Sequence, residues 1–163
     1  MSANWGNNIE LSIFGESHGP AIGIVIGGLP AGMKLDMDEI RWFMKRRAPG
    51  QNQMSTPRKE KDEFQIVSGI RDGVTTGAPL CAMIENTNTH SKDYSELKVN
   101  MRPGHSDYPA YIKYHGYNDV RGGGHFSGRL TAPIVLAGSI ARQILLEKGI
   151  IIGAHMKQIH HVQ

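Results

Sequence analysis

The stretch from Met101 to Pro133 concentrates side chains that can bind anions and move protons. Arginine suits planar oxyanions because its guanidinium donates two parallel hydrogen bonds. Histidine titrates near neutral pH and can act as a proton donor or acceptor. Neither a helical period nor a strand alternation runs through the stretch, so we interpret it as a long loop that binds an anionic ligand. Its arginines and histidines are Arg102, Arg121, Arg129, His105, His115 and His125.

A run of three glycines, Gly122 to Gly124, lies inside this stretch. Glycines allow close backbone approach to a ligand, and successive N–H groups in such a turn can cradle an anion. A helix is predicted to follow, with Ser127 or Thr131 as its N-cap and Pro133 in its first turn. The positive end of that helix would favour a phosphate or carboxylate. The alternative is an ordinary surface loop with a glycine turn.

Further histidine chemistry is possible in the sequence GESHGP, residues 15–20. The flanking segments 9–14 and 21–26 are predicted to be strands, so the connection would hold Ser17 and His18 at one end of a sheet. From these residues alone, His18 could equally be a loop histidine that bonds to backbone.

The segment 36–47 is predicted to be a helix. Asp36 and Glu39 form a capping-box pattern, and the sequence Ala48-Pro49 ends the helix. Arg46 and Arg47 fall in its last turn. They either stabilise the negative end of the helix dipole or point into a phosphate site.

The remaining elements predict an α+β fold in one segment, residues 1–163. Segments 63–70 and 80–86 are predicted to be antiparallel strands joined through RDGVTTGAP, and 133–148 a long apolar helix that ends at Gly149. Segment 150–156 is predicted to be a further strand. Polar loops are expected at 49–61 and 87–97.

Composition sets broad limits on the class of protein. A chain of 163 residues with 20% charged side chains is typical of a globular domain. The net charge of +3 permits acidic small molecules or nucleic acid. Cys81, the single cysteine, is expected to be buried, and the simplest compartment is a reducing cytoplasm. The sequence shows no membrane-spanning or secretory pattern, and His155, His160 and His161 lack the partners of a metal site.

Several motifs together resemble the chorismate synthase family. They are FGESHG (14–19), RRAPGQN (46–52), SGIRDGVTTGAP (68–79), IENTN (84–88), RPGHSDYPAYIKY (102–114) and RGGGHFSGRLTAP (121–133). Many members of that family have arginine and serine where His125 and Phe126 stand here. The resemblance covers nearly the whole chain.

The resemblance implies a β-α-β sandwich of antiparallel sheets around helices, of which this chain supplies roughly the first half. It implies a lyase that converts 5-enolpyruvylshikimate 3-phosphate to chorismate and phosphate, with reduced FMN required and NADPH a possible reductant of the flavin. His18 would protonate the departing phosphate, and His105 would keep the flavin in its productive protonation state. The substrate would be held by Ser17, Arg46, Arg47, Arg102 and Arg129, and the flavin by Arg47, His125, Phe126 and Ser127.

The resemblance also implies a cytoplasmic homotetramer with no role for nucleic acid or membrane. Because family members are more than twice as long, we expect the 163 residues alone to bind FMN weakly and to lack turnover. The competing hypothesis is a non-catalytic, basic module that binds nucleic acid or another anion through the tyrosines and arginines of the central stretch. Asp107 and Asp119 among those tyrosines argue against it.

Overall fold

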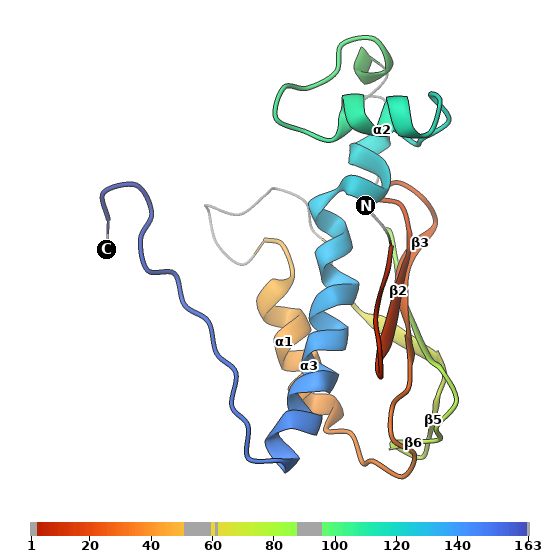
Figure 1. Ribbon diagram of the computed structural model, residues 1–163, viewed down its shortest axis with the longest axis vertical. Coiled ribbons are helices and arrows are strands. Elements are labelled where there is room, and N and C mark those ends of the chain that lie inside the picture. Colours follow the sequence, from red (N-terminus) through yellow and green to blue (C-terminus); the bar gives the residue numbers. More distant parts are fainter. Residues whose placement is uncertain (1–2, 51–59, 61, 88–95, 163) are drawn as a thin grey trace.

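The computed structural model describes residues 3–50, 60, 62–87 and 96–162. Within these residues, five strands form one antiparallel sheet, and helices α1 and α3 lie side by side on one of its faces (Figure 1). This arrangement confirms the predicted α+β class. The order across the sheet is β1 (Asn4–Gly6), β2 (Glu10–Gly15), β3 (Ala21–Gly27), β7 (Leu80–Glu85) and β4 (Phe64–Ser68).

The core lies between the central strands and the two helices. Ile22, Ile24 and Ile26 of β3 stand directly opposite Ile84, Ala82 and Leu80 of β7, and all six are at most 2% exposed. Leu136 and Ile140 of α3 pack against this row. Burying one such aliphatic side chain contributes about 1.5–3 kcal/mol, so this pairing fixes the register of the strands that lead into the loop 15–20.

Cys81 alternates with these core residues and lies on the other face of β7. Its side chain is only partly buried, so the expectation that Cys81 is a buried residue is wrong. The alternation of strand side chains explains the difference, because the helices cover only the face that carries Leu80 and Ala82.

Helix α1 (Met37–Arg47) begins where the capping pattern predicts. The Asp36 carboxylate accepts hydrogen bonds from the N–H groups of Asp38 and Glu39, at 3.0 and 2.9 Å. The reciprocal half of the capping box is absent, because the Glu39 carboxylate instead pairs with Arg142 of α3. The first acidic residue therefore caps α1, and the second ties α1 to α3.

Helix α3 (Thr131–Glu147) is preceded by a short 3₁₀ helix, η3 (Gly128–Leu130). Ser127 caps η3 by accepting from Arg129 N–H, whereas Thr131 is the first residue of α3 rather than its N-cap. Pro133 stands in the first turn, as predicted. The Gln143 amide bonds both backbone groups of Asp36 at 2.9 Å, which fixes α3 against the start of α1.

The connection between β4 and β7 is more elaborate than a simple turn. The two strands pair antiparallel as predicted, but the chain leaves the sheet at Gly69, where φ is +86°. Two short strands, β5 (Ile70–Arg71) and β6 (Val74–Thr75), then form a separate hairpin. The turn residues predicted a reversal, and the extra hairpin forms within it.

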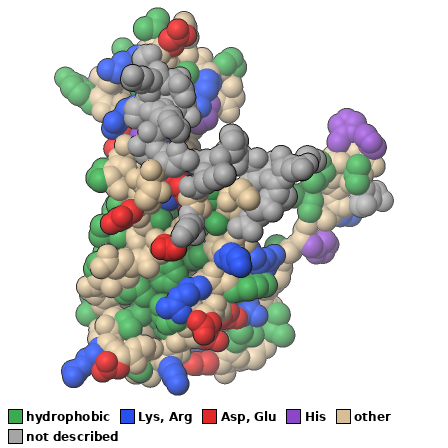
Figure 2. Space-filling model, turned by 180° about the vertical axis from the view of Figure 1, so that it is seen from behind, with side chains coloured by type: hydrophobic (Ala, Val, Ile, Leu, Met, Phe, Trp, Pro, Cys, Tyr) green, Lys and Arg blue, Asp and Glu red, His purple; other side chains and the backbone are tan. Residues whose placement is uncertain are grey.

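Two further expectations are wrong. The stretch predicted to be irregular contains α2 (Asp107–Lys113), with Asp107 and Pro109 in its first turn, and a 3₁₀ segment, η2 (Arg121–Phe126). The stretch predicted to be a strand, 150–156, has no strand pairing among the described residues and leaves Ile151 81% exposed. Its apolar composition favours a strand, but none of the described strands pairs with it, and Figures 1 and 2 show this tail standing away from the body.

The stretch Arg121–Glu147 has the length and mean hydropathy of a membrane span. It is not one straight helix, because Gly122, Gly123 and Gly124 have non-helical backbone angles. Its continuous part, α3, packs one face on β3 and α1, and 44% of the apolar window is buried. These features are those of a core helix.

Candidate active site

The loop between β2 and β3 is bonded to the glycine run of η2. Ser17 N–H donates to the Gly124 carbonyl at 3.0 Å, and Nδ1 of His125 lies 2.8 Å from the Gly15 carbonyl oxygen. Ser17 is fully buried and His18 is 8% exposed. Two segments more than 100 residues apart in sequence are therefore in direct contact.

The missing side chains of two glycines make room for the two histidines. A β-carbon on Gly122 would lie 2.5 Å from Cδ2 of His18 and 2.9 Å from Oγ of Ser17. A β-carbon on Gly123 would lie 3.1 Å from Cε1 of His105. His18 and His105 thus pack against consecutive residues of the glycine run.

His105 contacts the carboxylate of Asp107 and the guanidinium of Arg102. Its Nδ1 lies 2.7 Å from Oδ1 of Asp107, and Arg102 grips the same carboxylate with Nε at 2.8 Å and Nη2 at 2.9 Å. The hydrogen bonds from Arg102, together with its charge, hold the pKa of Asp107 well below its usual range, against the opposing effect of burial. An ionised Asp107 only accepts, so Nδ1 of His105 carries a proton and Nε2 faces Gly123.

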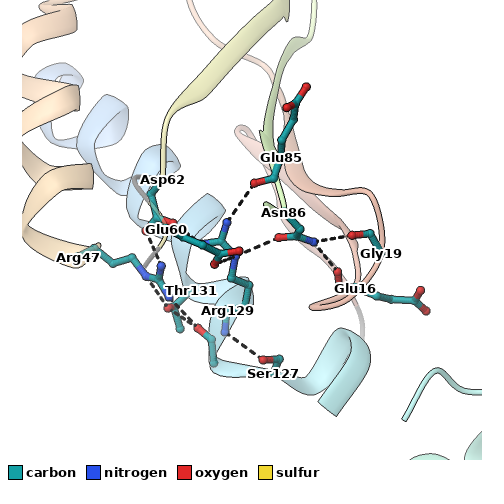
Figure 3. Close-up of polar contacts among 11 residues, drawn as sticks. Glu16, Gly19, Arg47, Glu60, Asp62, Glu85, Asn86, Ser127, Arg129 and Thr131 are labelled. Carbon is teal, nitrogen blue, oxygen red and sulfur yellow. Dashed lines mark hydrogen bonds and ion pairs between the residues drawn. The ribbon is translucent and has the colours of Figure 1, made fainter. Parts of the chain in front are cut away.

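Arg129 lies in a different environment from Arg102. Its side chain is 3% exposed and pairs with the buried carboxylates of Glu60, at 3.0 Å, and Asp62 (Figure 3). Its Nε also donates to the Asn86 side-chain oxygen at 3.1 Å. We call these residues, with Arg47, the Arg129 cluster. Its guanidinium is engaged inside the protein rather than presented to solvent.

The two arginines at the end of α1 diverge. Arg47 joins the Arg129 cluster through Asp62 at 2.5 Å and reaches Oγ1 of Thr131 at 3.3 Å, so it ties α1 to the start of α3. Arg46 is exposed, and its guanidinium stacks 4.7 Å above the ring of Trp42. Only Arg47 approaches the site. Arg46 and Arg47, for which the sequence predicts the same possible roles, therefore differ in the structure.

The third arginine of the central stretch, Arg121, is also paired. It grips Asp119 through Nε at 2.9 Å and Nη2 at 2.7 Å. The hydrogen bonds from Arg121 lower the pKa of Asp119, and Asp119 in turn raises the pKa of Arg121. Each arginine of the stretch therefore already has a carboxylate partner within the described chain.

The residues expected to hold a flavin direct their polar groups inward. Nδ1 of His125 lies on the Gly15 carbonyl, Oγ of Ser127 accepts from Arg129 N–H, and the ring of Phe126 lies 6.2 Å from those of both His125 and Tyr114. The polar groups of His125 and Ser127 therefore contact backbone atoms of the protein. Among the described residues, no three His, Cys, Asp or Glu side chains are grouped to hold a metal ion.

The structure thus brings Ser17, His18, Arg102 and His105 together around the glycine run. Arg129 instead belongs to the buried Arg129 cluster, and Arg46 is exposed at the end of α1. Sequence reasoning missed four residues that hold this arrangement: Asn86, Asp107, Glu60 and Asp62. Asp107 carries a usable signal, because it stands two residues after His105 and next to a helix start. Glu60 and Asp62 fall in a charged polar stretch, where nothing in the pattern indicates burial.

The sequence model of the family "Chorismate synthase" matches residues 9–163, which include every motif that lines this site. The chain belongs to the chorismate synthase family. Chorismate synthases from Ralstonia pickettii and Pyrococcus abyssi are 50% and 49% identical to it, over 98% and 97% of this chain and 44% of each relative. The chain therefore spans less than half the length of these curated relatives.

A solved structure supports the same assignment. A crystal structure of a chorismate synthase matches with a TM-score of 0.56 and 28% identity, over 88% of this chain and 35% of that chain. The α+β fold described above is therefore the fold of the matching part of that chorismate synthase.

Proposed function

We propose that this chain supplies the histidine-bearing part of a chorismate synthase site. The reaction would be the 1,4-elimination of phosphate from 5-enolpyruvylshikimate 3-phosphate to give chorismate. The observation that carries the proposal is the packing of His18 and His105 against consecutive glycines, Gly122 and Gly123, in a chain whose family match spans that whole region.

The elimination needs a proton for the leaving phosphate and donors for its oxygens. In this proposal His18 gives its proton to the phosphate oxygen as the carbon–oxygen bond breaks. The proton that leaves a second carbon of the substrate would go to a base supplied from outside this chain, and the electron pair of that carbon–hydrogen bond would enter the new double bond. Arg102 is the arginine best placed to bind an oxyanion, because its side chain is 37% exposed beside His105. Each hydrogen bond to a charged group contributes about 1.5–3 kcal/mol, so Arg102 would contribute measurably to substrate binding.

The flavin site would be shared with residues outside this chain. His105, with its Nε2 turned toward Gly123, and the ring of Phe126 are the groups of this chain that suit reduced FMN. When bound, reduced FMN would lend electron density during phosphate loss. NADPH as its reductant, a homotetrameric assembly and a cytoplasmic location belong to the same proposal and rest on family membership.

The rival hypothesis, a nucleic-acid-binding module, expects clustered basic charge beside exposed aromatics. Arg102 and Arg121 are instead neutralised by Asp107 and Asp119, and the face in Figure 2 shows basic and acidic side chains interspersed. These pairings argue against a nucleic-acid-binding surface formed by the two arginines.

Thermal unfolding of a hybrid enzyme tests the proposal. In the hybrid, this chain replaces the aligned segment of the Ralstonia pickettii chorismate synthase. Reduced FMN with 5-enolpyruvylshikimate 3-phosphate should raise the unfolding temperature, since a ligand at 100 times its Kd stabilises by about 2.7 kcal/mol. A single-stranded oligonucleotide should leave it unchanged. A rise with the oligonucleotide alone would overturn the proposal.

A further inference from the structure

Asn86 follows the last residue of β7 and donates three hydrogen bonds to the loop 15–20, which carries His18. Its side-chain Nδ2 donates to the carbonyls of Glu16 at 3.0 Å and Gly19 at 2.9 Å, and its backbone N–H donates to Pro20 at 3.1 Å (Figure 3). The two carbonyls that its amide binds stand on either side of Ser17 and His18. The amide therefore spans the segment that carries His18.

Arg129 decides which way this amide points. A guanidinium only donates hydrogen bonds, so the atom of Asn86 that lies 3.1 Å from Nε of Arg129 must be the oxygen. The NH₂ group then faces the two loop carbonyls, as their lone pairs require. Arg129 is itself fixed by the buried carboxylates of Glu60 and Asp62.

We propose that Asn86, oriented by Arg129, is a positioning residue for His18. The sequence of contacts runs from the buried carboxylates through Arg129 and Asn86 to the loop, and it ends where His18 meets Gly122. Arg129 acts in this account through Asn86 rather than as a ligand of the substrate. The catalytic consequence rests on the proposed function, whereas the position of His18 can be measured without it.

The loop needs such support because its own backbone is permissive. Gly15 has φ of +90°, and within the loop Gly19 N–H donates to the Glu16 carbonyl at 3.0 Å. A displacement of a catalytic group by about 1 Å can lower turnover ~10²-fold. Loss of the amide contacts would therefore affect catalysis more than folding.

The substitution Asn86→Asp separates these two effects. A carboxylate still accepts from Arg129, but it cannot donate to the Glu16 and Gly19 carbonyls and repels them. Asn7→Asp makes the same change of charge on an exposed asparagine and serves as the control. If Asn86→Asp fails to fold, Asn86→Ala at this partly exposed position removes the same two donors without adding charge.

The primary measurement is nuclear magnetic resonance on the isotope-labelled 163-residue chain. The native chain and Asn7→Asp should show a nuclear Overhauser effect between the imidazole Hδ2 of His18 and Hα of Gly122. In Asn86→Asp this effect should vanish and the His18 ring signals should shift, while the signals of His105 stay in place. An unchanged His18–Gly122 effect in the Asn86 variant would overturn the proposal.

Turnover in the hybrid enzyme gives the second measurement. We expect kcat to fall ~10²-fold for Asn86→Asp with KM changed by less than about threefold, since the proton donor moves while the arginine contacts remain. A displaced His18 with unchanged kcat would show that the positioning is real and that the proposed role of His18 is wrong. An unmoved His18 with reduced kcat would overturn the positioning role alone.

Discussion

Removing the charge of Arg129 should destabilise the protein strongly. The side chains of Arg129, Glu60 and Asp62 are at most 3% exposed, so Arg129→Met leaves a buried carboxylate without its cation. Breaking a buried ion pair by removing one partner costs about 3–5 kcal/mol. Asp62 keeps its contact with Arg47, which places the expected loss at the lower end of that range. For a chain of this size, ~3 kcal/mol lowers the melting temperature by about 6–12 °C.

Urea denaturation followed by circular dichroism measures this loss. Arg46→Met is the matched control, because Arg46 is exposed and its stacking on Trp42 contributes only about 0.5–1 kcal/mol. Adding Glu60→Gln to Arg129→Met should restore part of the stability, since it removes one uncompensated charge. Equal free energies of unfolding for Arg129→Met and Arg46→Met would refute the assignment of Arg129 to a structural cluster.

Two further predictions concern the histidine sites. Because the folded-state pKa of Asp107 is lowered, its contribution to stability is present above about pH 4, the unfolded pKa of aspartate, and is lost as pH falls below it. Asp107→Asn should therefore flatten the acid side of a plot of unfolding free energy against pH, and an unchanged slope would contradict the pairing of Asp107 with Arg102. Gly122→Ala should displace the His18 ring and lower turnover of the hybrid enzyme ~10²-fold, because its β-carbon would lie 2.5 Å from Cδ2. Gly128→Ala, where nothing lies within 4 Å, should retain activity.

The sequence predicts much of this fold because its strongest patterns are local. The cap of α1, the alternation in β3 and β7 and the proline in the first turn of α3 each follow from neighbouring residues. The segment 150–156 shows the limit of that reasoning: its apolar residues favour a strand, yet a strand forms only beside a sheet edge. Helix α2 is not predicted from the sequence because it is only seven residues long and the glycines and aromatic residues around it show no helical period.

The residues of the candidate site likewise fall into two groups, those that the sequence predicts and those that only the structure identifies. Histidines and glycines could be named from spacing, but which arginine is buried depends on contacts between distant segments. Arg102 and Arg129 look alike in the sequence, and only the carboxylates at 60 and 62 distinguish them. The role of Asn86 likewise depends on a loop some 70 residues away.

Chorismate formation by the hybrid enzyme tests the central claim most directly. Supplied with reduced FMN and 5-enolpyruvylshikimate 3-phosphate, the hybrid should form chorismate. His18→Ala and His105→Ala should each lower its turnover by ~10²–10⁴-fold, the usual contribution of a general acid–base group. His115→Asn, a change in an exposed histidine with positive φ that asparagine tolerates, should have little effect. A folded hybrid that forms no chorismate, or one in which the His18 and His105 variants match His115→Asn, would contradict the account.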